Sequence, residues 1–177
     1  TNVNLVNVFT CEIHPVDIGI YGDRIALVVP AGSERLETAQ VLDGRGKWAV
    51  PGFIDTHVHI ESTMVSPPNF AAAVLPLGTT TAVIDPHEIG NVLGMDGVRY
   101  MLEASEGLPL RVLVTVPSCV PAVPGIETAG AEFGPEQVAE MLTWPRVVGI
   151  AEVMDVPGVA NANPRMAGIV GAGLAAD

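Results

Sequence analysis

The chain of 177 residues carries 20 acidic and 8 basic side chains, a formal net charge of −12, and 49% of its residues are hydrophobic. That hydrophobic fraction excludes a disordered chain, and the negative charge argues against binding to nucleic acid or to an anionic membrane surface. No run approaches the ~18 consecutive apolar residues of a membrane span, so we expect one or two domains and no membrane segment.

The first residues and the two cysteines indicate the compartment. The N-terminus lacks the basic region and apolar core of a secretory signal. Cys11 and Cys119 lie far apart and match no disulfide or zinc-finger spacing. We therefore expect a cytoplasmic protein with reduced thiols.

Residues 1–50 are predicted to form a small all-β module, a β-sandwich. A β-rich stretch covers residues 3–9, and residues 17–21 and 24–29 flank a Gly-Asp hairpin signal at 22–23. Residues 38–42 predict a further strand. His14, next to Pro15, is predicted to lie in a surface turn.

From residue 51 the sequence changes to repeated strand–helix units. Apolar, β-branched runs at 52–57, 79–85, 111–116 and 147–153 alternate with helix-like segments at 68–75, 91–106, 135–142 and 164–176. Strand centres roughly 30 residues apart are typical of parallel strands joined by helices. The continuous apolar runs predict strands that are buried on both faces.

These units predict an α/β fold in which residues 51–177 form the first half of a (β/α)8 barrel of the TIM type. Such a barrel needs eight strands and about 200 residues or more, and this sequence supplies about four units. Half a barrel leaves unpaired strand edges. Either a longer chain or a second copy or fragment would complete it, and we expect a homo-oligomer.

A His-x-His pair at the end of the first apolar run of these units is the strongest chemical signal. Side chains alternate along a strand, so His57 and His59 point to the same face. Two neighbouring imidazoles make half of a transition-metal site. The plainer interpretation is two polar residues on a solvated face.

Further polar residues follow the other strands and would converge with this pair if the strands are neighbours. Those expected to converge are Asp85, His87 and Glu88 after the second strand and Glu152 after the fourth. Ser118 and Cys119 follow the third strand and are given no role. A (β/α)8 barrel places its chemistry at these carboxyl ends. Imidazole and carboxylate ligands suit Zn, Mn, Fe or Co better than Ca.

Structural roles for the same residues remain open at this point. His87 and Glu88 could cap the next helix after an ordinary Asp-Pro turn. Glu152 could pair with Arg146 or Arg165, and Glu61 could cap the segment after the first strand. The sequence contains no Gly-x-Gly-x-x-Gly, no phosphate loop, no Gly-x-Ser-x-Gly, and no zinc-deaminase His-x-Glu with a later Pro-Cys-x-x-Cys.

The Pro-Gly-Phe-Ile-Asp-x-His-x-His run at 51–59 resembles the amidohydrolase superfamily. His-Ile-Glu-Ser at 59–62, Asp-Pro-His-Glu at 85–88 and Glu-Val-Met at 152–154 resemble its bacterial adenine deaminase family more specifically. The resemblance covers nearly the whole chain. It implies hydrolysis of adenine to hypoxanthine and ammonia, with metal-bound hydroxide attacking purine C6, and hence a small-molecule purine substrate.

The resemblance also implies roles for individual residues. His57 and His59 would bind one metal of a two-metal Fe(II) or Mn(II) centre, with Zn as an alternative, and Glu152 would bridge both metals. Asp85, His87 and Glu88 would serve proton transfer or substrate binding, and Glu61 and Ser62 would contact the substrate. Such enzymes take further ligands from later strands, so the resemblance implies that this chain alone is inactive.

Two other functions stay open. The chain could belong to another amidohydrolase that acts on a cyclic amide or an N-acyl substrate. It could also be a metal-binding half-barrel without turnover.

Overall fold

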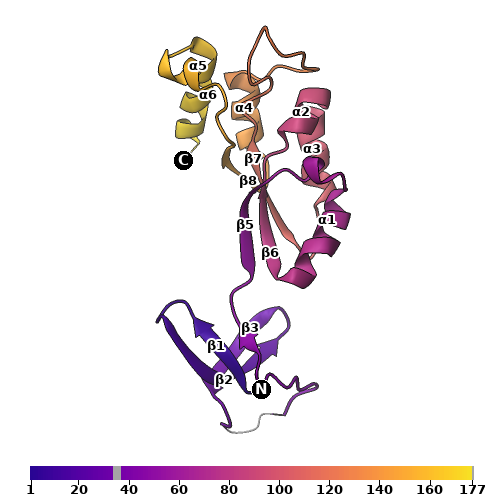
Figure 1. The fold of residues 1–177 in the computed structure, drawn as a ribbon, viewed down its shortest axis with the longest axis vertical. Coiled ribbons are helices and arrows are strands. Elements are labelled where there is room, and N and C mark those ends of the chain that lie inside the picture. Colours follow the sequence, from indigo (N-terminus) through magenta and orange to yellow (C-terminus); the bar gives the residue numbers. More distant parts are fainter. Residues whose placement is uncertain (34–36, 177) are drawn as a thin grey trace. The chain divides into compact units, whose positions relative to one another are not determined.

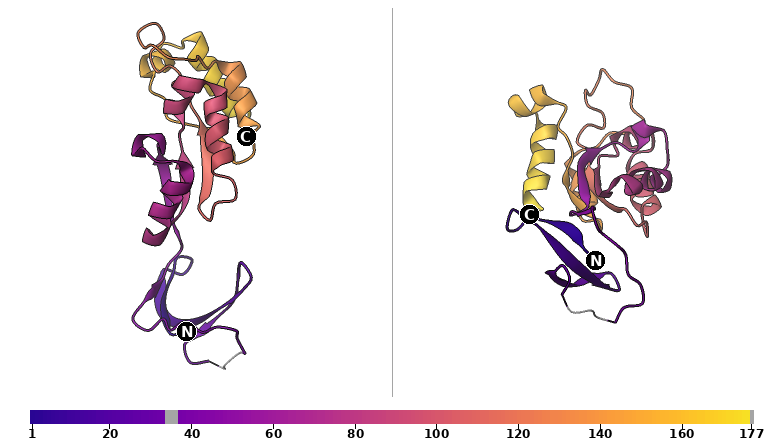
Figure 2. Two further views of the ribbon diagram at one scale, coloured as in Figure 1. Left: turned by 90° about the vertical axis from the view of Figure 1, so that its right-hand side faces the viewer. Right: turned by 60° about the horizontal axis from the view of Figure 1, so that its bottom comes forward.

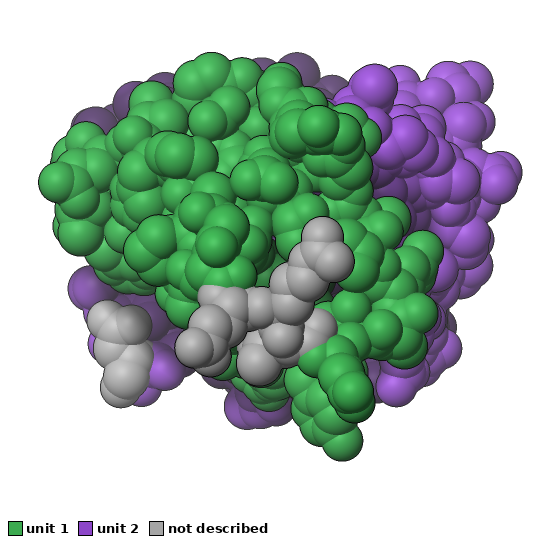
Figure 3. All heavy atoms as spheres, turned by 90° about the horizontal axis from the view of Figure 1, so that it is seen from below, with its two compact units in different colours: residues 1–51 green, residues 52–177 purple. Residues whose placement is uncertain are grey.

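The computed structural model describes residues 1–33 and 37–176 (Figure 1). Residues 34–36 and Asp177, which fall within the predicted domains 1–50 and 51–177, lie outside the described residues. The chain divides into two compact units, Thr1–Pro51 and Gly52–Asp177, which are coloured separately in Figure 3.

The unit Thr1–Pro51 contains one four-stranded sheet, and the β-sandwich stays a prediction. Its strands, in the order β3-β2-β1-β4, are β1 (Val3–Asn7), β2 (Glu12–Tyr21), β3 (Arg24–Pro30) and β4 (Trp48–Ala49). β2 pairs antiparallel with both β1 and β3, while β4 pairs parallel with β1. The predicted hairpin turn joins β2 to β3, where Gly22 has a φ of 60° that favours glycine.

Two predictions for this unit are wrong. Residues 38–42 form no strand, because the free side of β1 is paired with β4 (Trp48–Ala49), which lies further along the chain. His14 does not lie in a turn. It lies within β2, opposite Leu5 of β1.

The unit Gly52–Asp177 is built on a parallel sheet whose strand order follows the chain. Its strands are β5 (Phe53–Val58), β6 (Thr79–Ile84), β7 (Arg111–Val116) and β8 (Val147–Ile150). The connecting helices are η1 (Glu61–Thr63), α1 (Pro67–Val74), η2 (Leu75–Leu77), α2 (His87–Leu93), α3 (Met95–Ala104), α4 (Pro135–Leu142), α5 (Val156–Ala160) and α6 (Pro164–Ala175). The expected alternation of strands and helices is therefore present.

The helix expected over residues 91–106 is two helices. α2 ends at Leu93 and α3 begins at Met95, with Gly94 between them at φ 65° and ψ −145°. A side chain strongly disfavours this backbone conformation, so glycine permits the break. α2 begins earlier than expected, directly after Asp85-Pro86.

Helices cover one face of this sheet (Figures 1 and 2). The core joins alternate residues of β6 and β7 to side chains of the helices: Ala82, Ile84, Val112, Val114, Val116, Phe70, Val98, Met101, Val138, Met141, Met166 and Ile169. The intervening strand residues, such as Val83 and Leu113, are only half-buried. Burial on both faces was expected and is not found, because the described helices of this unit pack on one side only.

Across the described ranges 1–33 and 37–176, every helix falls short of the length and apolar character needed to cross a membrane.

Candidate metal centre

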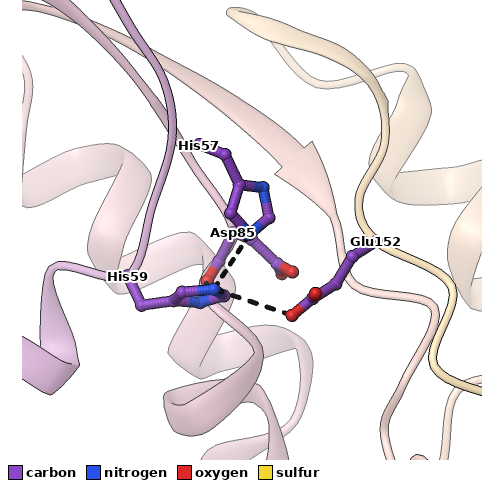
Figure 4. Close-up of side chains that lie close together, drawn as sticks. All are labelled: His57, His59, Asp85 and Glu152. Atoms are coloured by element: carbon purple, nitrogen blue, oxygen red, sulfur yellow. Dashed lines mark hydrogen bonds and ion pairs between the residues drawn. The ribbon is translucent and has the colours of Figure 1, made fainter.

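The polar residues singled out in the sequence meet at the carboxyl edge of the parallel sheet. His57 lies in β5 and His59 follows its end, Asp85 directly follows β6, and Glu152 comes two residues after β8. Since consecutive strands are neighbours, three separate strand ends deliver these side chains to one place. One ligand atom from each of these four residues lies within 4.8 Å of the others (Figure 4).

The ring of His59 is oriented by the backbone. Its Nδ1 lies 2.9 Å from the carbonyl oxygen of Asp85, and a carbonyl can only accept a hydrogen bond, so Nδ1 carries a proton. In the neutral ring, Nε2 therefore keeps its lone pair. Histidines that bind metals are commonly fixed in this way through the other ring nitrogen.

The free nitrogen of His59 points at His57 and Glu152. The two Nε2 atoms of His57 and His59 are 3.0 Å apart, and His59 Nε2 lies 3.6 Å from Glu152 Oε1 (Figure 4). Two imidazole nitrogens and a carboxylate oxygen are thus directed toward a common point.

His87 and Glu88 open helix α2 beside this group. His87 Nδ1 lies 3.1 Å from Asp85 Oδ2 and 3.6 Å from Glu152 Oε1. The hydrogen bond with Asp85, and next the contact with Cys119, raise the pKa of His87 to about 11. In the absence of a bound metal, His87 is therefore an imidazolium at neutral pH.

Glu88 is held as a carboxylate. Burial acts to raise its pKa, but the hydrogen bond donated by Ser62 at 2.5 Å and the charge of His87 outweigh burial, and the net pKa lies below its usual value. Its Oε2 is buried, lies 3.3 Å from His59 Nδ1 and makes no hydrogen bond.

Glu61 and Ser62 lie in η1 and contact α2. Burial raises the pKa of Glu61, and the nearby Glu88 carboxylate acts in the same direction. Glu61 Oε1 accepts the backbone N–H of Ile89 at 3.4 Å, so this carboxyl supports the first turn of α2. Glu61 was considered as a cap for the segment that follows β5. It instead accepts a hydrogen bond from the first turn of another helix, α2.

Residues 48–170 match the model of the amidohydrolase family. The chain belongs to the amidohydrolase family. It is 52% identical over 177 residues to adenine deaminase 2 of Agrobacterium fabrum, covering 100% of this chain and 30% of that protein. It is 54% identical over 172 residues to adenine deaminase 2 of Rhizobium meliloti, and 52% over 172 residues to the adenine deaminase of Moorella thermoacetica; each match covers 97% of this chain and 29% of the relative. The chain thus spans about 30% of the length of the curated relatives it matches.

The side chains of this amidohydrolase fit a divalent transition metal. Without a cation, a buried oxygen of Asp85 (Oδ1) has no hydrogen-bond partner, and the imidazole nitrogens of His57 and His59 face each other across 3.0 Å. Buried unpaired polar atoms are costly, and a cation would satisfy both arrangements. Imidazole and carboxylate donors together suit Zn, Fe, Mn or Co.

Glu152 is not paired with either arginine considered for it. The guanidinium of Arg146 donates to Ser105 Oγ and to the carbonyls of Leu102 and Val112. Arg165 donates to carbonyls of the segment after β7 and of Phe133. Glu152 is therefore free to face the histidines.

Sequence reasoning gave no role to the residues directly after β7. Ser118 Oγ donates to the backbone carbonyl of Glu152 at 2.6 Å, which fixes the strand end that carries this ligand. Cys119 lies close to Asp85 and His87: one ligand atom from each of these three residues lies within 4.8 Å of the other two. The sequence did offer one signal for Ser118 and Cys119, namely their position directly after a strand. Residues after the other strands were assigned roles for that same reason.

Proposed function

We propose that the protein is part of an adenine deaminase that hydrolyses adenine to hypoxanthine and ammonia. The observation that carries this proposal is the extent of the similarity: 52% and 54% identity over 97 to 100% of the chain to proteins named adenine deaminase. The cluster of His57, His59 and Glu152 at one sheet edge supplies the matching chemistry.

We further propose that β5–β8 are the first four strands of a (β/α)8 barrel. Their parallel pairing, their order along the chain and the helices on one face support this architecture. Additional strands would pair with the outer edges of β5 and β8.

His57 and His59 would hold one metal, with Glu152 placed to bridge to a second. Fe(II) or Mn(II) are the proposed metals, with Zn as an alternative. When bound, such a metal supplies Lewis acidity and lowers the pKa of water.

The neighbouring residues handle protons and substrate in this proposal. Glu88 is ionised and its Oε2 is free, so this oxygen is suited to accept a proton from water. Asp85 Oδ2 fixes the ring of His87, which can give a proton to the purine or to the departing amine. Glu61 and Ser62, on η1, are proposed to contact the purine.

The remaining expectations stay proposals of the same kind: a small-molecule purine as the partner, a homo-oligomer, and a cytoplasmic location. The isolated chain is proposed to be inactive.

A chimera tests the function. The segment of the Moorella thermoacetica protein that matches this chain is replaced by residues 1–177, and ammonia release from adenine is measured with Mn²⁺. We expect turnover, its loss in the chimera with His57→Ala, and little change with His14→Ala, which lies in β2. A folded, metal-loaded chimera that opens a cyclic amide but leaves adenine intact would refute the assignment.

A further inference from the structure

A second group of metal-binding side chains lies next to the first and includes a thiol. One ligand atom each from Asp85, His87 and Cys119 lies within 4.8 Å of the others. Asp85 follows β6, His87 opens α2, and Cys119 follows β7, so two neighbouring strand ends and one helix supply the group. Asp85 belongs to both groups.

Burial distinguishes this second group. Asp85 is 0% exposed and Cys119 is 2% exposed, while the side chain of His87 is 17% exposed. The Oδ1 atom of Asp85 is buried and has no hydrogen-bond partner. A fully buried carboxylate oxygen without a partner indicates that a cation belongs beside Asp85, the residue that the two groups share.

The loop that carries Cys119 is fixed on both sides. Asn91 Nδ2 donates to the carbonyl of His87 at 2.9 Å and to the carbonyl of Cys119 at 3.3 Å. Arg165 Nη2 donates to the carbonyls of Ser118 and Val120, which flank Cys119. The thiol is therefore held in place beside His87 by hydrogen bonds to its own backbone and its neighbours.

We propose that Asp85, His87 and Cys119 form a separate binding site for a thiophilic divalent cation such as Zn²⁺, Co²⁺ or Cd²⁺. A tetrahedral ion with bonds of roughly 2.0 to 2.3 Å holds its ligand atoms roughly 3.3 to 3.8 Å apart. In the structure the three ligand atoms lie within 4.8 Å of one another, and His87 Nδ1 lies 3.1 Å from Asp85 Oδ2.

The ligand types separate the two sites by metal preference. Thiolate sulfur selects Zn and other soft cations, whereas carboxylate oxygens also accept Mn²⁺. Coordination takes a thiolate and a neutral imidazole, so the thiol proton of Cys119 and the extra proton of His87 are released to water as the cation enters.

Occupancy of this site has a consequence that rests on the proposed function. A cation bound by Asp85 and His87 prevents the proton transfer proposed for His87 and occupies the Asp85 carboxylate that fixes the His87 ring. Thiophilic cations in excess over the catalytic metal are therefore expected to inhibit deamination through Cys119.

Co²⁺ titration of the purified protein tests the site without reference to activity. A Co²⁺–thiolate bond gives an intense charge-transfer absorption in the near ultraviolet, which histidine and carboxylate ligands do not give. We expect this absorption in the unaltered protein, its loss in Cys119→Ser, and its retention in Cys11→Ser, the matched control at an exposed cysteine of the other unit.

A second variant tests whether the two sites are separate. His57→Ala/His59→Ala is expected to keep the charge-transfer band. Absence of the band in the unaltered protein, its persistence in Cys119→Ser, or its loss in the double histidine variant would each overturn the proposal. If Cys119→Ser does not fold, as judged by circular dichroism, Cys119→Ala takes its place with loss of the band expected.

The chimera then separates this inference from the proposed function. Cd²⁺ should inhibit its adenine turnover at least tenfold less when Cys119 is replaced by serine. An inactive chimera refutes the deaminase assignment and leaves the spectroscopic result standing. An active chimera that Cd²⁺ inhibits equally with and without Cys119 overturns the inhibitory role.

Discussion

The two units of the chain use similar strand sequences and bury them very differently. Val16 is the single hydrophobic side chain of Thr1–Pro51 in the buried core of the described residues, whereas Gly52–Asp177 encloses a continuous core between helices and sheet. Phe9 and Tyr21 of the smaller unit are 94% and 84% exposed. Hydrophobic strands therefore form a core only where a second layer of structure covers them.

The largest expected effect comes from the core of Gly52–Asp177. Phe133 precedes α4, is 1% exposed and contributes to the core. Phe133→Ala should lower the free energy of unfolding by about 3 to 5 kcal/mol, because it removes a buried ring and leaves a cavity. Urea denaturation followed by tryptophan fluorescence measures this, and a loss below about 1 kcal/mol would contradict the described packing.

A somewhat smaller effect is expected at Arg165. Its guanidinium donates to four backbone carbonyls, those of Phe133, Ser118, Val120 and Pro121. Of these, the Val120 carbonyl also accepts the backbone N–H of Phe133. Arg165→Ala should cost about 2 to 3 kcal/mol, because hydrogen bonds from a charged donor are lost and buried acceptors are left unpaired. Arg24→Ala, which breaks an ion pair exposed to solvent, is the control and should change stability by less than about 0.5 kcal/mol.

His87 should make the stability of the larger unit depend on pH. Its folded pKa of about 11 lies above the ordinary value of 6.5, so its contribution is fully present below pH 6.5 and is lost as the pH rises toward 11. With metal removed by a chelator, the unfolding free energy should fall from pH 7 to pH 10. His87→Gln should flatten that fall, and an equally steep decline in the variant would exclude His87 as its source.

The smallest effect is expected in Thr1–Pro51. Phe9→Ala removes a ring that is almost fully exposed, so the unfolding free energy should change by less than about 0.5 kcal/mol. The same chemical change at Phe133 is expected to have several times the effect. Equal losses at the two phenylalanines would mean that Phe9 is covered by a surface beyond its own unit.

The parallel unit was largely predictable from sequence. Apolar runs separated by glycine-punctuated helical segments placed β5, β6 and β7 to within one or two residues, since the period of each segment was clear. The break at Gly94 was missed, because a glycine inside a helical pattern is often tolerated. The strand predicted at 38–42 is absent, because β1 pairs with β4 (Trp48–Ala49) instead, and a local sequence pattern does not show which segment a strand pairs with.

The candidate site was predictable in its members and not in its contacts. The positions of His57, His59 and Glu152 after apolar runs were enough to suggest that they meet. No sequence pattern shows that the Asp85 carbonyl orients His59, because that hydrogen bond depends on the stagger of two neighbouring strands. Cys119 was passed over for a similar reason: its neighbour His87 is distant in sequence.

The order of the parallel strands fixes the order in which the metal-binding residues are synthesised. Because β5, β6, β7 and β8 lie side by side in the order of synthesis, the imidazoles of His57 and His59 leave the ribosome well before Glu152 is made. At about 5 to 20 residues per second, the interval is on the order of ten seconds. During translation the two histidines are therefore present before Glu152 has been made. The side chains of His57, His59, Asp85 and Glu152 can come together only after the chain has passed β8.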